Sequence, residues 1–241
     1  MILAILACKA VGTAQSKLEK KEKTKRRKLF GTPMCSADGI CHENATIPTP
    51  RTPYSARSLE QFQAWTNEHN LLVDNAATYT KHLTTRNPLE SRSRPLVLLG
   101  DSITESYLGT SFRDKVERAQ GTPEVLESFA QTHALLPLVL GISGDQTQHL
   151  LWRLQNGELP LGRLRELPGA TFVVLIGTNN LGSGMMPAEA AAGVMAIVDW
   201  LLLNTAGKII VLDLLPRGDG KSALRCRLGW VTSHRMHYSS S

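Results

Sequence analysis

Small and polar residues follow three apolar runs of the chain, each at the point where a run ends. The tetrapeptide Gly-Asp-Ser-Ile occupies residues 100–103, Gly144 comes shortly after the second run, and Gly-Thr-Asn-Asn occupies residues 177–180. A serine hydroxyl on a sharp turn from strand to helix is exposed and can attack a carbonyl carbon. These residue types, in this order, predict acyl transfer with Ser102 as the nucleophile.

Three hydrogen-bond donors are expected around the negative charge that this attack creates. They are the main-chain amides of Ser102 and Gly144 and the side-chain amide of Asn179, and glycine at 144 lets the backbone approach the reacting group closely. Each position also has a simpler interpretation, because Asp101 and Asp145 could cap helices and Asn179 could serve a turn. It is the joint occurrence of the three groups that favours a catalytic site.

The elements that must position these groups follow from the pattern of apolar residues. Four continuous apolar runs predict buried strands, and they begin 42, 34 and 37 residues apart, which leaves room for a helix between each pair. The runs are Leu96–Leu99, Leu138–Ile142, Phe172–Ile176 and Ile209–Leu214. The predicted helices are Ser58–Leu83, Ser111–Gln131, Asp145–Gln155 and a deeply packed Pro187–Leu203. This alternation predicts a parallel α/β sheet with helices on both faces and a site at the carboxyl ends of its strands.

The residues at the strand ends carry a family resemblance. Residues 100–103 resemble block I of the SGNH (GDSL-type) hydrolases, Gly144 resembles the glycine of block II, and residues 177–180 resemble block III. The resemblance spans about Pro95 to Gly218. It implies a flavodoxin-like, three-layer fold with a five-stranded parallel sheet, ester hydrolysis through Ser102 with Gly144 and Asn179 in the oxyanion hole, and neither a metal nor an organic cofactor.

Two longer segments, residues 141–159 and Leu-Leu-Pro-Arg-Gly at 214–218, resemble one branch of that family. The branch comprises the catalytic subunits of intracellular platelet-activating-factor acetylhydrolase. It implies a lipid or carbohydrate ester that loses a short acyl group, acetyl being favoured. It also implies a homodimer or a regulatory protein partner of the propeller type.

The chain departs from the family in its last block. The family supplies its catalytic base and the acid that orients it from an Asp-x-x-His motif well beyond Leu-Leu-Pro-Arg-Gly, whereas only 23 residues follow Gly218. His234 and His237 do not have aspartate three residues earlier, and His149 is interpreted as a packing or hydrogen-bonding residue. No base is therefore assigned. We expect a fold that is incomplete at its C-terminus and an esterase of reduced or no activity; the alternative is a non-catalytic α/β module for binding or interaction.

Charge and composition exclude several other classes. The chain has 241 residues and a net charge of +6, but residues 17–28 hold eight basic and two acidic residues, so the rest is formally neutral. A nucleic-acid-binding fold is therefore not indicated. No apolar run approaches the roughly 20 residues of a transmembrane helix, and the four cysteines form no CxxC pair that would indicate zinc.

Four regions are expected along the chain. Residues 1–56 read as a weak leader, the basic run and a Thr/Pro-rich linker, mostly disordered, and residues 57–93 as a helical lead-in. Residues 94–218 are the hydrolase-like domain, and residues 219–241 an atypical polar tail. The leader and the glycosylation sequon at Asn44, with Cys35 and Cys41 near enough to pair, leave both a cytoplasmic and a secreted location open.

Overall fold

The computed structural model describes residues 34–35, 41–52, 58–85, 93–167 and 169–215. The chain divides into two units, residues 1–44 and 45–241. In the first unit, β1 (Met34–Cys35) pairs with β2 (Cys41–His42) in an antiparallel arrangement that sets Cys35 opposite Cys41. The expected leader, the basic run, His234, His237 and the polar tail lie outside the described residues.

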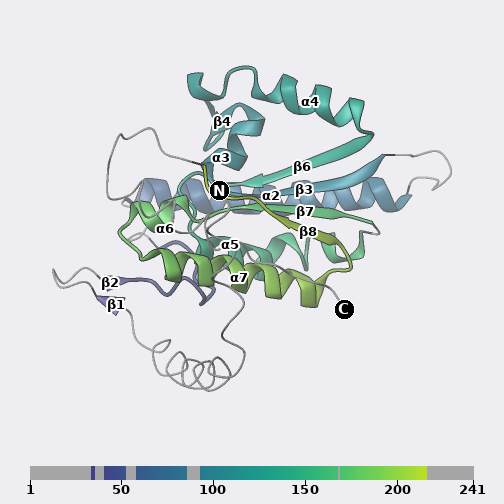
Figure 1. The fold of residues 1–241 in the computed structure, drawn as a ribbon. Coiled ribbons are helices and arrows are strands. Elements are labelled where there is room, and N and C mark those ends of the chain that lie inside the picture. The colour runs from purple at the N-terminus through teal and green to yellow at the C-terminus, as the bar shows by residue number, and fades with distance from the viewer. Residues whose placement is uncertain (1–33, 36–40, 53–57, 86–92, 168, 216–241) are drawn as a thin grey trace, which may run out of the picture. The chain divides into compact units, whose positions relative to one another are not determined.

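A parallel sheet forms the centre of the second unit. Its strands lie in the order β6-β3-β7-β8, and every neighbouring pair is parallel (Figure 1). The strands are β3 (Arg94–Gly100), β6 (Leu135–Gly141), β7 (Thr171–Leu175) and β8 (Lys208–Val211). Each of the four predicted apolar runs therefore forms or overlaps a strand of one sheet.

Helices cover both faces of this sheet. In Figure 1, α4 lies on one side of the sheet, and α5 and α7 lie on the other. The longer helices are α2 (Leu59–Thr85), α4 (Thr122–Thr132), α5 (Thr147–Arg153) and α7 (Pro187–Asn204), and the short ones are α3 (Ser102–Glu105) and α6 (Thr178–Gly182). The predicted three-layer α/β architecture is confirmed.

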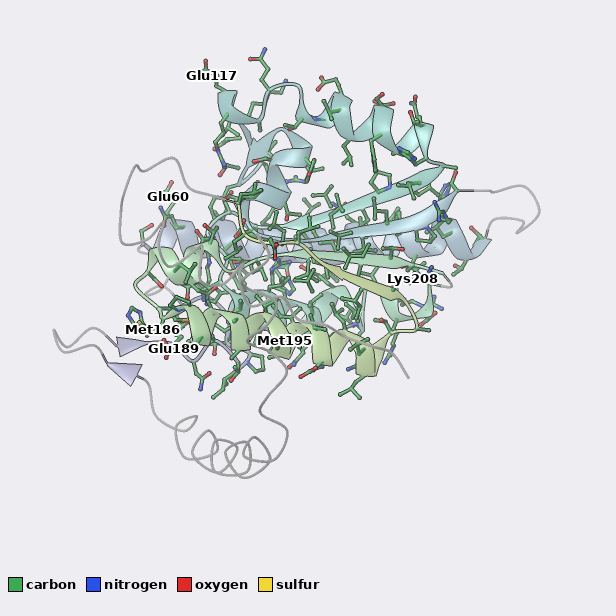
Figure 2. All side chains as sticks on the ribbon, in the orientation of Figure 1. Glu60, Glu117, Met186, Glu189, Met195 and Lys208 are labelled. Atoms are coloured by element: carbon green, nitrogen blue, oxygen red, sulfur yellow. The ribbon has the colours of Figure 1, made fainter. Side chains whose placement is uncertain are left out.

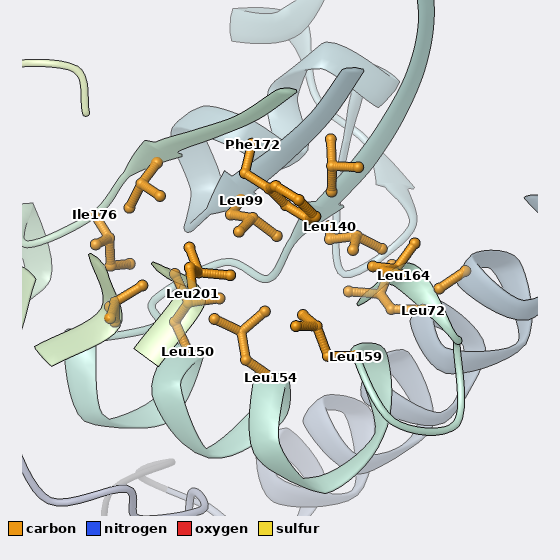
Figure 3. Close-up of a cluster of buried hydrophobic side chains, with 14 of the residues drawn as sticks. Leu72, Leu99, Leu140, Leu150, Leu154, Leu159, Leu164, Phe172, Ile176 and Leu201 are labelled. Carbon is orange, nitrogen blue, oxygen red and sulfur yellow. The ribbon is translucent and has the colours of Figure 1, made fainter. Parts of the chain in front are cut away.

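The apolar side chains of β3 explain why a continuous run of apolar residues predicts a strand that is covered on both faces. Val97 and Leu99 belong to the large core cluster shared by α2, α5 and α7, much of which Figure 3 shows. Leu96 and Leu98 belong to a separate cluster on the other face, against which Leu126 of α4 packs. Successive side chains of a strand point to opposite faces, so a strand between two helical layers buries all of them.

The lead-in helix α2 is anchored to this layer by hydrogen bonds. The amide of Gln61 donates to the hydroxyl of Ser58 at 3.1 Å, which confirms Ser58 as the cap. Tyr79 donates to the Leu136 carbonyl at 2.6 Å, and Thr80 to the Gly162 carbonyl at 2.8 Å. These bonds hold α2 against β6 and the loop at Gly162.

The prediction of one helix over Ser111–Gln131 is wrong in its first half. That half holds a small hairpin of β4 (Thr110–Ser111) and β5 (Asp114–Lys115), followed by a 3-10 turn, Glu117–Ala119. Phe112 and Arg113 form the tight turn with φ of 48° and 69°. Helix α4 starts only after Gly121, whose φ is +80°, with proline in its first turn.

The helix predicted over Asp145–Gln155 is also displaced, since α5 starts at Thr147. A kinked turn, η4 (Leu154–Glu158), follows it, and Asn156 and Gly157 within this turn have non-helical φ and ψ. Within this turn the amide of Leu159 donates to the carbonyl of Leu154, five residues earlier, at 3.3 Å. A further 3-10 turn, η5 (Leu164–Glu166), leads into β7. Asp145 lies in the loop before α5.

Helix α7 matches its predicted range but packs less completely than expected. One face is buried against the sheet, whereas Leu202 and Leu203 at its end are exposed. By length and composition alone, α7 could span a membrane. Because residues such as Ile197 and Leu201 are fully buried against the sheet, it is the core helix of an α/β domain. Charged side chains such as Glu60 and Lys208 lie on the outside of the domain (Figure 2).

The Thr/Pro-rich segment of residues 45–52 is not the disordered linker that its composition predicts. Ala45 and Arg51 are only 3% and 6% exposed. The amide of Thr49 donates to the Gln148 carbonyl at 3.2 Å, and the hydroxyl of Thr147 donates to the Ala45 carbonyl at 3.1 Å. A segment outside helices and strands can still dock when a neighbouring loop supplies hydrogen-bond partners for its backbone.

Candidate active site

The strand register brings three loops to one edge of the sheet. Gly100, the last residue of β3, pairs with Gly141 at the end of β6 and with Leu175 at the end of β7. A side chain on Gly100 would overlap Thr104 and the Leu175 carbonyl, and a Cβ on Gly141 would lie 2.5 Å from the amide nitrogen of Glu105. Helix α3 therefore packs directly on the strand ends, which requires glycine at both positions.

Ser102 is the first residue of α3 and is partly exposed. The preceding Asp101 is fully buried, and its Oδ1 accepts the Ile103 amide at 3.0 Å, so the capping interpretation holds for this residue. Burial raises the pKa of Asp101 to about 7, and the charge of Asp145 adds to this rise. Within the described residues no hydrogen bond reaches the hydroxyl of Ser102, which leaves it free to meet a substrate.

The loop after β6 is tied to α3 by one carboxylate. Oε2 of Glu105 accepts both the amide of Ser143, at 2.8 Å, and its hydroxyl, at 2.6 Å. The Ser143 hydroxyl also lies 2.7 Å from that of Ser111. Gly144 follows with φ of +80°, a conformation that favours glycine. Glu105 thus couples the helix that carries Ser102 to the loop that carries Gly144.

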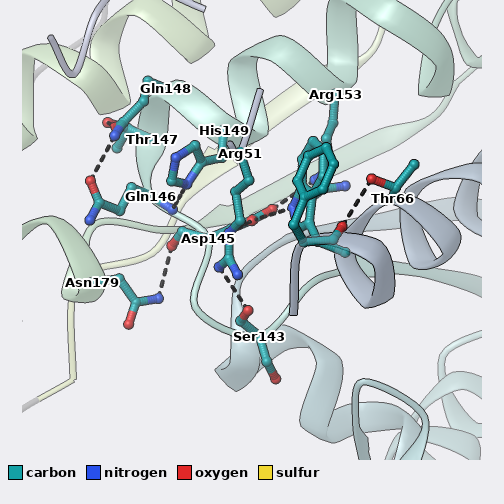
Figure 4. Close-up of polar contacts among 12 residues, drawn as sticks. Arg51, Thr66, Ser143, Asp145, Gln146, Thr147, Gln148, His149, Arg153 and Asn179 are labelled. Carbon is teal, nitrogen blue, oxygen red and sulfur yellow. Dashed lines mark hydrogen bonds and ion pairs between the residues drawn. The ribbon is translucent and has the colours of Figure 1, made fainter. Parts of the chain in front are cut away.

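Asn179 lies in the first turn of α6 and reaches the same loop. Its Nδ2 donates to the main-chain carbonyl of Asp145 at 2.8 Å (Figure 4). Its neighbour Asn180 accepts the amide of Thr147 at 3.0 Å through Oδ1. The structure therefore brings Asn179 beside Gly144, whereas no hydrogen bond of the described residues joins Ser102 to either of them. The strand register and the hydrogen bonds of Glu105 set Ser102 at the same edge of the sheet.

Asp145 does not cap α5. It is fully buried and accepts Trp65 Nε1 at 2.8 Å and Arg153 Nε at 2.8 Å, and its Oδ1 lies 3.2 Å from Arg51 Nε (Figure 4). Arg153 is itself fully buried and pairs with Glu158 as well. Burial alone would lower the pKa of Arg153, but the carboxylates of Glu158 and Asp145 raise it above its ordinary value.

The buried ion pairs continue toward α2. Nδ1 of His69 lies 3.8 Å from Oε1 of Glu158, and the His69 ring stacks on Trp65 with centroids 5.8 Å apart. A Cβ on Gly157 would lie 2.5 Å from Val73 and 3.0 Å from the His69 ring, so glycine permits this close packing. We call the four charged residues Arg51, Asp145, Arg153 and Glu158 the buried charge chain.

Most of the buried charge chain left no signal in the sequence pattern. Arg153 stands between apolar residues in a predicted helix, and a charge at such a position indicates a buried ion pair. Arg51 and Trp65 gave no comparable signal, because their partner Asp145 is 94 and 80 residues away.

His149 is not placed as a base for Ser102. It is buried in the first turn of α5, and its Nδ1 accepts the amide of Gln146 at 3.1 Å (Figure 4). The hydrogen-bonding interpretation of His149 is confirmed. Among the described residues, no group of three or more His, Cys, Asp or Glu side chains is arranged to hold a metal ion.

Comparison with known proteins gives two groups of similar chains. Platelet-activating factor acetylhydrolase IB subunit alpha2 of Homo sapiens is 32% identical over 176 residues, covering 72% of this chain and 61% of the relative. The alpha1 subunit of Pongo abelii is 42% identical over 102 residues, covering 41% of this chain and 39% of the relative. This chain therefore matches about three-fifths of the length of its alpha2 relatives.

Among solved structures, the SGNH-hydrolase family esterase AlinE4 is 22% identical with a TM-score of 0.43, covering 58% of this chain and 69% of that one. The sequence profile of the GDSL-like Lipase/Acylhydrolase family matches residues 98–233, which is more than half of the chain and includes Ser102, Gly144 and Asn179. The predicted family is thus confirmed: the chain belongs to the GDSL-like lipases and acylhydrolases.

Proposed function

We propose that the protein is a serine ester hydrolase that removes a short acyl group, acetyl being favoured, from a lipid or carbohydrate ester. The observation that carries the proposal is that the loops of Ser102, Gly144 and Asn179 all begin at the carboxyl ends of neighbouring strands. Asn179 is also hydrogen-bonded to the Gly144 loop. The acetyl preference rests on the names of the relatives, which are acetylhydrolase subunits.

The reaction proceeds by acyl transfer to Ser102 and then to water. The Ser102 oxygen attacks the ester carbonyl carbon, its proton passes through a base to the departing alcohol, and an acyl-serine is left. Water then attacks the acyl-serine, the acid leaves, and the proton returns to Ser102. In both steps the oxyanion accepts hydrogen bonds from the amides of Ser102 and Gly144 and from Asn179. A carboxamide has two N–H donors, so Asn179 can keep its bond to Asp145 while it donates the second.

The base that this reaction requires is not among the described histidines. No hydrogen bond or ion pair in the described part of the chain joins a histidine to Ser102, and the histidines nearest the charge chain, His69 and His149, are buried. An oxyanion hole without such a base retains only a small part of the rate, so the rate of ester hydrolysis tests whether this chain supplies one. The second candidate is a non-catalytic module that binds an acylated ligand.

A fluorophosphonate probe separates these two functions. Labelling of the wild-type chain at Ser102, abolished in Ser102→Ala, would support the esterase, because the probe reacts with an activated serine. Exposed Ser128 on α4 provides the matched control, because Ser128→Ala removes a hydroxyl far from the strand ends. Lack of labelling in the folded wild-type chain would favour the binding module. Hydrolysis of p-nitrophenyl acetate at rates typical of enzymes, lost in Ser102→Ala, would overturn the prediction of weak activity.

The partners inferred from the same resemblance are a second copy of the chain or a regulatory protein. The relatives are described as subunits, which supports an assembly of some kind. Light scattering coupled to size exclusion tests the homodimer directly, and a mass equal to that of one chain would contradict it.

A further inference from the structure

Arg51 lies upstream of the region that matches the family, residues 98–233, yet its guanidinium lies against Gly144. Its Nη2 donates to the Ser143 carbonyl at 2.8 Å, and its Nε lies 3.2 Å from Oδ1 of Asp145. A Cβ on Gly144 would lie only 2.6 Å from Nη2. One buried side chain thus contacts the residue before Gly144, the residue after it and the space over Gly144 itself (Figure 4).

The carbonyl that Arg51 holds and the amide of Gly144 belong to the same peptide unit. A peptide unit is planar and trans, so its C=O and N–H point in opposite directions and turn together. A hydrogen bond that fixes the Ser143 carbonyl therefore also fixes the direction of the Gly144 N–H. A charged donor on the carbonyl also polarises the peptide, which makes its N–H a stronger donor.

The neighbouring peptide units are held by other groups. Glu105 accepts the amide of Ser143, and the amide of Asp145 donates to the carbonyl of Ile142 at 3.1 Å. Among the hydrogen bonds of the described residues, the one from Arg51 is what holds the Ser143–Gly144 unit. Asp145 keeps Arg153 and Trp65 as partners when Arg51 is removed. The loss of Arg51 should therefore act on this one peptide unit more than on the buried charge chain as a whole.

We propose that Arg51 is a positioning residue of the oxyanion hole, which holds the Ser143–Gly144 peptide so that the Gly144 N–H faces the reacting carbonyl. The proposal rests on the proposed function. Under this proposal the active site also depends on the docked segment of residues 45–52, which precedes the region that matches the family, residues 98–233.

The test uses the full chain with Arg51→Ala, Arg51→Lys and a control, Arg163→Ala. Arg163 is an exposed arginine that pairs with Glu166. Lysine keeps the charge, but its single ammonium group does not reproduce the arrangement of Nη2 on Ser143 and Nε on Asp145. Removal of one oxyanion donor slows catalysis by about 10²–10³-fold, so misdirecting a donor should slow maximal fluorophosphonate labelling by about tenfold or more, with little change in affinity for the probe.

Two further measurements distinguish positioning from a contribution to stability. Guanidinium chloride at millimolar concentration should restore the labelling rate of Arg51→Ala, whereas sodium chloride of equal ionic strength should not. Hydrogen exchange at the Gly144 amide should accelerate about tenfold in Arg51→Ala, with exchange in α7 unchanged. If Arg51→Ala does not fold, Arg51→Lys carries the same two comparisons.

The outcomes separate this proposal from the proposed function. Exchange at Gly144 does not depend on catalysis, so accelerated exchange without any labelling of the wild type would support the role of Arg51 and overturn the esterase. Labelling of the wild type together with wild-type rates and exchange in both Arg51 variants would overturn the role of Arg51 and leave the esterase intact. A uniform rise in exchange over the whole domain would reduce Arg51 to a stabilising residue and so overturn the proposal.

Discussion

The two sides of the sheet differ in the side chains that surround their strands. Around β3 and β6, the strand ends are surrounded by buried polar groups that pair with one another, as Asp145 does with Arg51 and Arg153. On β8 and directly after it, by contrast, Ile210, Val211 and Leu212 are 43–47% exposed, and β8 is the last strand on its side of the sheet among the described residues. A group of apolar side chains at a sheet edge is usually covered by another element or a partner. The site depends on the buried polar groups around β3 and β6. Substitutions there should lower the free energy of unfolding far more than substitutions on β8.

The largest effect is expected from Arg153→Met, which removes the centre of the buried charge chain. Asp145 would keep Arg51, but Glu158 would be left with only the neighbouring His69. Removing one partner of a buried ion pair costs about 3–5 kcal/mol of unfolding free energy, which urea denaturation measures. Arg163→Met on the surface should leave the urea midpoint unchanged. Equal midpoints for the two variants would show that the polar side is no more sensitive than the surface.

The second-largest effect is expected in the pH dependence of the free energy of unfolding, and it originates at Asp101. Because burial raises its pKa from 3.8 to about 7, the folded state holds a proton between these pH values that the unfolded state releases. The free energy of unfolding should therefore fall as pH rises from about 4 to 7, by on the order of 3 kcal/mol. Asp101→Asn keeps an oxygen to accept the Ile103 amide but has no charge, so its stability should fall less over this range in urea titrations at several pH values. A smaller fall should remain because burial also raises the pKa of Glu68. Parallel curves for the two proteins would contradict this origin.

A smaller effect is expected from Gly144→Ala. Alanine would adopt φ of +80° and place its Cβ 2.6 Å from Nη2 of Arg51. The backbone strain costs about 1–2 kcal/mol, and the displaced guanidinium adds to it. Gly121→Ala is the matched control, because Gly121 has the same φ and nothing lies within 4 Å of its Cβ position. Thermal or urea unfolding measures the loss of stability in both variants, and the difference between the two losses isolates the contact with Arg51. Equal losses of stability would contradict a contribution from that contact.

The smallest effect is expected on β8. Ile210→Lys should change the free energy of unfolding by no more than about 0.5 kcal/mol, because the side chain is already largely exposed. It should also reduce self-association in light scattering, since a charge on an edge strand opposes pairing. A loss of several kcal/mol would mean that this edge is covered in solution, and the contrast between the two sides would disappear.

The sequence predicted the layers of the fold better than the details of the site. Continuous apolar runs located all four strands because helices cover both faces, and the small residues after them located the loops of Ser102, Gly144 and Asn179. The turn at Phe112 and Arg113 was missed, because neither residue type favours positive φ. Arg51 was missed because its partners, Ser143 and Asp145, lie more than 90 residues away, and a segment rich in Thr and Pro resembles a linker until a loop supplies its hydrogen bonds.

The turn Leu154–Glu158 has a consequence for how this chain can change in length. Asn156 and Gly157 within it have non-helical φ and ψ, so the chain kinks between Arg153 and Glu158. Deleting or inserting a residue at this kink would change the direction of Glu158 and part it from Arg153, although no charged residue had been replaced. The length of this turn is therefore as important to the buried charge chain as the identity of its residues.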